Sequence, residues 1–381
     1  MKIVYCTDSI CYPGGIQTVT ITKANALSKI EGNEVWIIVT DNKREPIENI
    51  EKNVHLIDLD INYYEDDYKS KWHILKGIFI KRKQHKNKLR NILNDIGPDI
   101  IVSTGTSEKF FLPNIKINSN PQFIREIHFT RNYRSLNARN LFEKISAKIG
   151  DFIDYKLSIN RYNSIVVLTE QDKNENWENN KKIIAIPNPI KSLPYKTSTI
   201  ENKKVIAAGR LTHQKNFASL IRSWNSVVNN HPDWSLEIYG NGAEYNNLLT
   251  LISNLKLEKH VFLKGHSYNI LEEMANASIF TLTSTFEGFG LVIVEAMSCG
   301  LPVISYNCPC GPKDIISDGT DGFLVPLNDE QCLAEKINLL IENEALRKQM
   351  SKAALIKSQK FTAKEVISLW MNLFNTLKNE K

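Results

Sequence analysis

Short apolar runs alternate with longer segments whose apolar residues recur every three or four positions. The runs are rich in Val and Ile, as buried strands are, and the longer segments have the spacing of helices. In the first half of the chain, strands are expected at 2–6, 34–40, 54–59, 99–103, 122–127 and 164–169, and helices at 16–29 and 137–160. This alternation predicts a parallel, doubly wound α/β sheet.

The alternation stops at a proline-rich passage around Pro187, Pro189 and Pro194 and then starts again. The second series of strands is expected at 204–208, 235–239, 261–264, 278–283, 302–306 and 322–325. We therefore expect two Rossmann-like domains, 1–187 and 188–360, with a C-terminal helix over 361–381 that packs back on the first. Ligands of such sheets bind at the carboxyl ends of the strands, so two facing edges would form a cleft.

Composition places the chain among soluble globular proteins, with 381 residues, 42% apolar and 24% charged. The opening residues MKIVYC are typical of a buried strand, not of a secretory signal. No apolar run approaches the roughly 18–20 residues that span a bilayer. A cytoplasmic protein is expected, soluble or peripheral to the inner face of the membrane.

Six cysteines are present, and Cys308 and Cys310 form a C-P-C sequence that is one residue short of a CxxC ligand pair. No second Cys or His pair stands near them, so reduced and mostly buried thiols are expected. Zinc or disulfide roles are the alternatives.

The net charge of +6 is unevenly placed, because residues 68–94 hold nine basic residues and only polar or apolar ones besides. They are Lys69, Lys71, Lys76, Lys81, Arg82, Lys83, Lys86, Lys88 and Arg90. One interpretation is docking on anionic lipid. The other is a helix with an apolar face on the core and a charged outer face. Nucleic acid is not expected as a partner, because aromatic residues are not interleaved with the basic ones.

Two clusters follow predicted strands of the second domain, where ligands of α/β sheets bind. Residues 209–216 include Arg210 and Lys215, whose charges suit phosphate oxygens. Residues 287–295 begin and end with Glu and enclose Gly288 and Gly290. A helix starting near Gly290 would offer its first amides to an anion. By propensity alone, however, the Leu-Val-Ile-Val run that follows favours a strand.

The segments GRLTHQKN, FLKGH, TSTFEGFGLVIVEAMSCGLPVIS and DGTDGFLVP closely resemble the second domain of family 4 retaining glycosyltransferases, which have the GT-B fold. The resemblance is strong over 203–327. The first domain resembles the family in outline only, through Pro13-Gly14-Gly15, PDIIVST and IPNPI.

The resemblance implies a role for each matching residue. Arg210 and Lys215 match the basic pair that neutralises the donor diphosphate. Glu287 matches the acid near the sugar hydroxyls, and Glu295 the acid that holds the ribose. The loop that contacts sugar and phosphates through its backbone amides is matched by Phe289, Gly290 and Leu291.

Further matches are implied outside this loop. His266 falls where the family's backbone meets the nucleobase, and Gly14 and Gly15 match the glycine loop that closes over the donor. His128 resembles the family histidine at the reacting centre. Nearby arginines could line an acceptor path or belong to a solvated helical face; these are Arg131, Arg134 and Arg139.

The resemblance therefore implies a retaining transfer of a hexose or N-acetylhexosamine from a UDP-sugar to a glycan or lipid-linked glycan, in surface polysaccharide synthesis. No metal or other cofactor is expected, because the Asp-x-Asp pair Asp58 and Asp60 ends a first-domain strand away from the donor residues. Two alternatives remain, a GT-B epimerase acting on a UDP-sugar and an inactive subunit that recruits a partner to the membrane.

Overall fold

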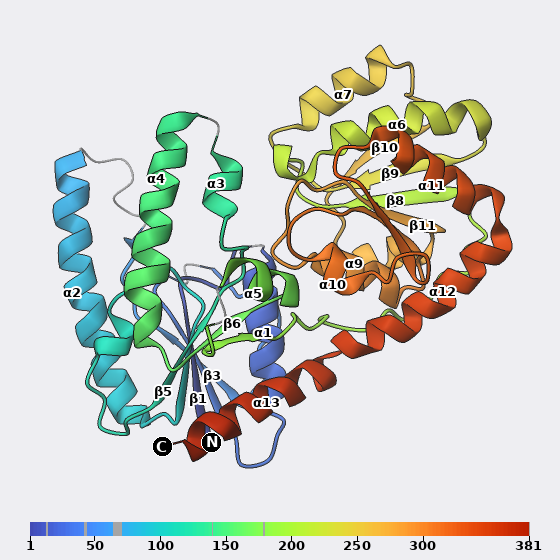
Figure 1. The fold of residues 1–381 in the computed structure, drawn as a ribbon. Helices are drawn as coiled ribbons and strands as arrows, with labels where there is room; N and C mark the ends of the chain where they lie inside the picture. The colour runs from blue at the N-terminus through green and yellow to red at the C-terminus, as the bar shows by residue number, and fades with distance from the viewer. Residues whose placement is uncertain (13, 42–43, 64–70, 139, 178–179, 381) are drawn as a thin grey trace. The chain divides into compact units, whose positions relative to one another are not determined.

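The computed structural model describes residues 1–12, 14–41, 44–63, 71–138, 140–177 and 180–380, and the side chains of 71–78 and 156–158 are not described. The chain forms two compact units (Figure 1). The first comprises Met1–Leu168, Trp177–Lys191 and Ala363–Lys381, and the second Thr169–Asn176 and Ser192–Thr362. Pro13, Lys69 and Arg139 lie outside the described residues.

The first unit is built on a seven-stranded parallel sheet in the order β3-β2-β1-β4-β5-β6-β7. Its strands are β1 (Lys2–Thr7), β2 (Glu34–Val39), β3 (Val54–Asp58), β4 (Ile100–Ser103), β5 (Gln122–Glu126), β6 (Ser164–Val167) and β7 (Ile183–Ala185). Strands β1 and β4 are almost wholly buried, as is usual when helices cover both faces of a parallel sheet. Strand β7 was not predicted from the sequence.

The helices of the first unit are α1 (Gly15–Leu27), α2 (Lys71–Ile96), α3 (Tyr133–Asn137), α4 (Leu141–Phe152) and α13 (Ala363–Asn379). Shorter helical turns are η2 (Leu112–Asn114), η3 (Ile153–Ser158) and η4 (Ile159–Arg161). Although α13 is last in the sequence, its Val366, Trp370 and Phe374 join the core formed by β1 and α1. Figure 1 shows this helix running along α1.

The expected helix over 137–160 is present but begins later than predicted: α4 starts at Leu141, and η3 and η4 continue the helical segment to Arg161. Ala138 adopts an extended conformation after α3. Asn140 then starts α4: its side chain accepts a hydrogen bond from the amide of Glu143 and donates one to the Glu143 carboxylate, each 2.9 Å long. The Asn140 side chain thereby satisfies a free amide of the first turn and fixes the helix start.

The second unit holds a six-stranded parallel sheet in the order β10-β9-β8-β11-β12-β13. Its strands are β8 (Lys204–Ala208), β9 (Ser235–Tyr239), β10 (Val261–Gly265), β11 (Ile279–Leu282), β12 (Val303–Tyr306) and β13 (Gly322–Val325). Its helices are α6 (Phe217–Asn230), α7 (Tyr245–Asn254), α8 (Ile270–Ala275), α9 (Leu291–Ser298), α10 (Pro312–Ile315), α11 (Glu330–Glu342) and α12 (Glu344–Ser358), with turns η5 (His213–Lys215) and η6 (Gln359–Phe361). Helix α5 (Glu170–Asn176) groups with this unit, which the sequence did not predict.

All six cysteines are free thiols, and five of them are buried. Burial raises the pKa of the Cys299 thiol to about 12, which keeps it protonated and unreactive. The part of the chain that the structure describes contains no helix long and apolar enough to cross a membrane.

Candidate active site

The order of strands in the second unit reverses between β8 and β11, which lie side by side in the sheet. A crevice for ligands forms at such a reversal, beyond the carboxyl ends of the strands. The loop after β8 carries Arg210 and Lys215, and the loop after β11 carries Glu287. The two sequence clusters therefore meet at the position where this sheet can hold a ligand.

Backbone contacts join the loop after β8 to the end of β9, and the end of β9 to the end of β10. The amide of Gly209 donates to the carbonyl of Tyr239 at 2.9 Å, and that of Gly240 to the carbonyl of Gly265 at 2.7 Å. Gly240 has a φ of +141°, and a Cβ there would lie 1.9 Å from the Gly209 carbonyl oxygen, so only glycine fits. The chain that follows Gly265 carries His266, which is exposed.

Lys215 and Glu287 form the charged centre of this site. The Lys215 Nζ lies 2.6 Å from Oε1 of Glu287, and the Ser284 hydroxyl donates to the same oxygen at 2.6 Å. Both side chains are largely buried. Glu287 thus accepts two hydrogen bonds that fix the position of its carboxylate, while Lys215 keeps two further donors.

Helix α9 begins at this point, and the strand that propensity favours for Leu-Val-Ile-Val is wrong. Gly290, in the left-handed conformation with a φ of +88°, turns the chain into the helix at Leu291. Phe289 is buried before it, and its carbonyl oxygen would lie 2.2 Å from a Cβ on Gly311. Glu295 is on the second turn of α9 and is half-buried. The first amides of α9 therefore lie in the loop that follows β11, where a phosphate would be stabilised.

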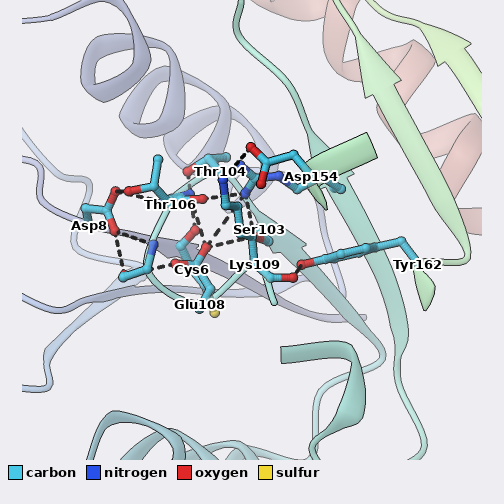
Figure 2. A network of polar contacts seen from close by, with 12 residues as sticks. Cys6, Asp8, Ser103, Thr104, Thr106, Glu108, Lys109, Asp154 and Tyr162 are labelled. Carbon is cyan, nitrogen blue, oxygen red and sulfur yellow. Dashed lines mark hydrogen bonds and ion pairs between the residues drawn. The ribbon is translucent and has the colours of Figure 1, made fainter. Parts of the chain in front are cut away.

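In the first unit the strand order reverses between β1 and β4, and a polar network lies at their carboxyl ends (Figure 2). The Asp8 carboxylate accepts hydrogen bonds from the amide and hydroxyl of Thr106, both at 2.8 Å, and from the Ser107 hydroxyl at 2.6 Å. These bonds tie the loop after β1 to the loop after β4. The sequence reasoning did not single out Asp8.

Glu108 is buried beside this network. It accepts a hydrogen bond from the Ser103 hydroxyl at 2.7 Å and one from the amide of Gly105 at 3.1 Å. Burial, and then the negative charge of Asp8, raise the pKa of Glu108 to about 7, against the opposing effect of Arg125. The carboxyl is therefore able to exchange a proton near neutral pH.

A second group of charges extends this network toward α4. Lys109 lies 2.8 Å from the Asp154 carboxylate, and Arg134 pairs with both Asp154 and Asp151. The Tyr162 hydroxyl donates to the carbonyl of Lys109 at 2.9 Å (Figure 2). Arg134, which could have belonged to a solvated face, is instead held in an ion-pair cluster.

His128 follows β5 and is buried against an ion pair formed by Lys23 and Glu126. Its Nε2 lies 3.4 Å from the Glu126 carboxylate. Burial lowers the pKa of His128 to about 4, although Glu126 acts in the opposite direction. The imidazole is therefore neutral at physiological pH.

His128 lines a cavity of about 140 Å³ at the carboxyl edge of the first sheet. The cavity is also lined by Ile16 and Gln17, which directly follow the Gly14-Gly15 loop at the start of α1. The structure thus brings the glycine loop and the histidine to one place within the first unit. Residues that also line this cavity, and that sequence reasoning had not selected, are Asp8, Lys109 and Asp154.

The low pKa of His128 predicts that the first unit loses stability in mild acid. The folded pKa of about 4 lies below the ordinary histidine value of 6.5, so the stabilisation is complete above pH 6.5 and is lost as the pH falls to about 4. The loss amounts to roughly 3 kcal/mol. Melting temperatures between pH 7 and pH 4 should fall less steeply for His128→Asn than for the parent, and equal slopes would contradict this assignment.

The signal for the missed residues was present in the sequence. Asp8 directly follows the first strand, and Thr104 to Glu108 follow the fourth strand as a run of small and polar residues. Both loops lie at the strand reversal, but the reversal is known only once the strand order is known. Among the described residues, no three His, Cys, Asp or Glu side chains are grouped so as to hold a metal ion.

Comparisons with known proteins agree with this architecture. Residues 196–356 match the family described as glycosyl transferases group 1. The chain is 28% identical to an uncharacterized glycosyltransferase of Haemophilus influenzae, over 98% of this chain and 99% of that protein. It is 31% identical to the amylovoran biosynthesis glycosyltransferase AmsD of Erwinia amylovora, over 55% of this chain and 62% of AmsD.

Among solved structures, the chain resembles a mutant of TarM from Staphylococcus aureus, crystallised with fondaparinux, alpha-GlcNAc-glycerol and UDP. The TM-score is 0.77 with 17% identity, over 98% of this chain and 99% of that one. A likeness at this identity bears on the fold, and it agrees with the two parallel sheets described above. Residues 196–356 are therefore a glycosyl transferases group 1 domain, and the chain has the two-domain GT-B fold of glycosyltransferases.

Proposed function

We propose that this glycosyltransferase is a retaining enzyme of family 4 that moves a hexose or N-acetylhexosamine from a UDP-sugar to a glycan or lipid-linked glycan acceptor. The observation that carries the proposal is the meeting of Lys215, Glu287 and the start of α9 at the strand reversal of the second sheet. A cation beside a helix N-terminus suits a diphosphate, and the adjoining carboxylate suits sugar hydroxyls.

The roles follow from this geometry and from the family resemblance. Arg210 and Lys215 would stabilise the negative charge that builds on the departing nucleoside diphosphate. The amides around Gly290 would hold the phosphates. Glu287 would accept hydrogen bonds from the sugar, and Glu295, one turn further along α9, would hold the ribose.

Four more residues take roles that the family resemblance implies. His266, exposed after β10, would lie near the nucleobase, and the Gly14-Gly15 loop would close over the donor. His128, neutral at physiological pH, would act at the reacting centre as a hydrogen-bond partner. The name of one relative supports a role in surface polysaccharide synthesis, since AmsD is named for amylovoran biosynthesis. The crystallisation of TarM with UDP supports a UDP-linked donor.

A panel of nucleotide sugars tests the donor directly. A ligand that binds only the folded protein raises its melting temperature, and the rise grows with affinity. UDP-hexoses and UDP-N-acetylhexosamines are expected to raise it more than GDP- or ADP-sugars at the same concentration. A larger rise with a GDP-sugar would overturn the assignment of UDP.

Metal removal gives a second test of the proposal. Transfer is expected to continue in excess EDTA, because Arg210 and Lys215 supply the positive charge that a divalent cation supplies elsewhere. Initial rates with and without the chelator should agree within about twofold, since the chelator removes none of these charges. Complete loss of turnover that magnesium or manganese restores would contradict metal independence.

A further inference from the structure

The outward face of α4 is apolar. Six residues of α4 and the turn after it have exposed fractions between 41% and 81%. They are Leu141, Phe142, Ile145, Ile149, Phe152 and Ile153. The exposed residues of a helix are normally polar, and its apolar residues normally face the core. Helix α4 has the opposite arrangement, with apolar residues on its exposed face.

Helix geometry confines these six side chains to one side. At 3.6 residues per turn they fall within a sector of roughly 120°. Ala147 and Asp154 lie on the opposite side and are buried against the first unit. The stripe is therefore continuous along more than three turns of helix, and we call it the α4 stripe.

Positive charge borders the stripe. Lys144 and Lys148 are exposed and, one turn apart, follow one edge of it. Glu143 is at the start of the helix, on the other side, where it accepts a hydrogen bond from the Asn140 side chain. An apolar stripe with lysines along its edge is the pattern of a helix that lies in a lipid interface, with the lysine heads reaching the lipid phosphates.

Helix α2 adds apolar and basic residues of the same kind. Phe79 and Ile80 are exposed by 81% and 59%. Two basic residues of the stretch from 69 to 90, however, already form hydrogen bonds within the first unit. Lys81 donates to the carbonyl of Asn62, and Lys88 donates to the carbonyl of Leu59. Exposed basic residues remain at Lys83, Lys86 and Arg90.

We propose that the α4 stripe inserts into the surface of an anionic membrane, with the exposed lysines beside it contacting lipid phosphates. A lipid surface suits the stripe better than a second copy of the chain does. Two antiparallel copies of α4 pairing through the stripe about a twofold axis would bring Lys144 and Lys148 of each copy close to those of the other, and like charges would repel. An anionic surface instead attracts these charges.

The stripe adjoins a groove that leads toward His128. Phe142 and Ile153 also line an open groove of about 670 Å³ between α3 and α4. Lys109 and Arg134 line both this groove and the cavity of His128. A membrane at the stripe would present an amphiphilic acceptor to this groove, a consequence that rests on the proposed function, whereas membrane binding itself does not.

Vesicle co-sedimentation tests the proposal with the full chain. The stripe variant carries Leu141→Ser, Ile145→Ser and Ile149→Ser, which are exposed and do not line the groove. The control variant carries Leu249→Ser, Ile356→Ser and Leu369→Ser, which are exposed apolar residues of other helices. With vesicles containing phosphatidylglycerol, the stripe variant should bind roughly tenfold or more weakly than the parent, and the control should bind like the parent.

Salt and vesicle composition separate insertion from simple charge attraction. The parent should keep part of its binding at about 1 M NaCl, because salt screens charges but not apolar insertion. Complete release by salt, or equal binding of the stripe variant and the control, would overturn the proposal. Vesicles of phosphatidylcholine alone should bind the parent less than anionic ones.

Two further readouts keep the outcomes distinct. If light scattering shows a dimer of the parent that the stripe variant breaks, with vesicle binding unchanged, a second copy covers the stripe and the proposal is wrong. UDP binding by calorimetry should be the same for parent and stripe variant, which shows that the variant is folded. Failure of UDP to bind any variant, with vesicle binding intact, would count against the proposed function alone.

Discussion

Replacing Glu287 by Gln is expected to lower turnover by roughly a hundredfold while UDP binds almost as before. The carboxylate faces Lys215 at 2.6 Å, so the variant loses a charge at the sugar position and leaves the lysine free to pair with phosphate. Replacing Glu295 by Gln should have the opposite effect. It should weaken binding of UDP and of the donor alike, by about 1–3 kcal/mol, because a charged hydrogen bond to a part that does not react is lost.

Calorimetry with UDP and steady-state kinetics with the true donor distinguish the two glutamates. Glu330→Gln is a suitable control, because Glu330 on α11 is half-exposed and pairs with Arg222 on α6. This substitution should change neither UDP affinity nor turnover. If Glu287→Gln abolished UDP binding and Glu295→Gln left it intact, the two roles would be reversed.

The second large effect concerns stability. Lys23→Met should lower the free energy of unfolding of the first unit by about 3–5 kcal/mol, because it leaves Glu126 charged and without its lysine in the core. Both side chains are almost inaccessible to solvent. Lys23 lowers the pKa of Glu126 below its ordinary value, although burial of the carboxyl acts in the opposite direction. Lys23 also lies 4.6 Å from the centre of the Trp370 ring.

Urea denaturation measures this loss. Lys29→Met is the matched control, because Lys29 lies just after the same helix and pairs with Glu51 on the surface. The two side chains are 64% and 47% exposed, so loss of this ion pair should lower the free energy of unfolding by less than about 1 kcal/mol. Adding Glu126→Gln to Lys23→Met should recover much of the stability, because the uncompensated charge is removed. Equal effects of the two lysine substitutions would show that the buried ion pair contributes no more to the free energy of unfolding than the exposed one.

The sequence pattern predicted the sheets well because a parallel strand is buried along its whole length and its apolar run is unmistakable. It failed for α9, where Leu-Val-Ile-Val has strand propensity but Gly290 turns the chain and the sheet edge provides an apolar site for a helix. It also placed the start of α4 four residues too early, because Asn140, whose side chain caps the helix, was not recognised as its start.

The sequence predicted which residues belong to the candidate site, but not which of them contact one another. Arg210, Lys215, Glu287 and Glu295 are visible in the sequence, yet the contact between Lys215 and Glu287 joins positions 72 residues apart. Asp8 and Glu108 form a network only because β1 and β4 are neighbours in the sheet. Burial of Glu108, which changes its proton affinity, is a property of the folded chain.

The position of α13 in the core of the first unit has a consequence for synthesis. The ribosome completes the strands of the first sheet early, but Trp370 and Phe374, which cover β1 and α1, are made after the second unit. Domains usually fold in the order in which they are translated, whereas here the domain begun first is finished after the other. Until α13 leaves the ribosome, the nascent chain therefore exposes an apolar surface that chaperones can bind.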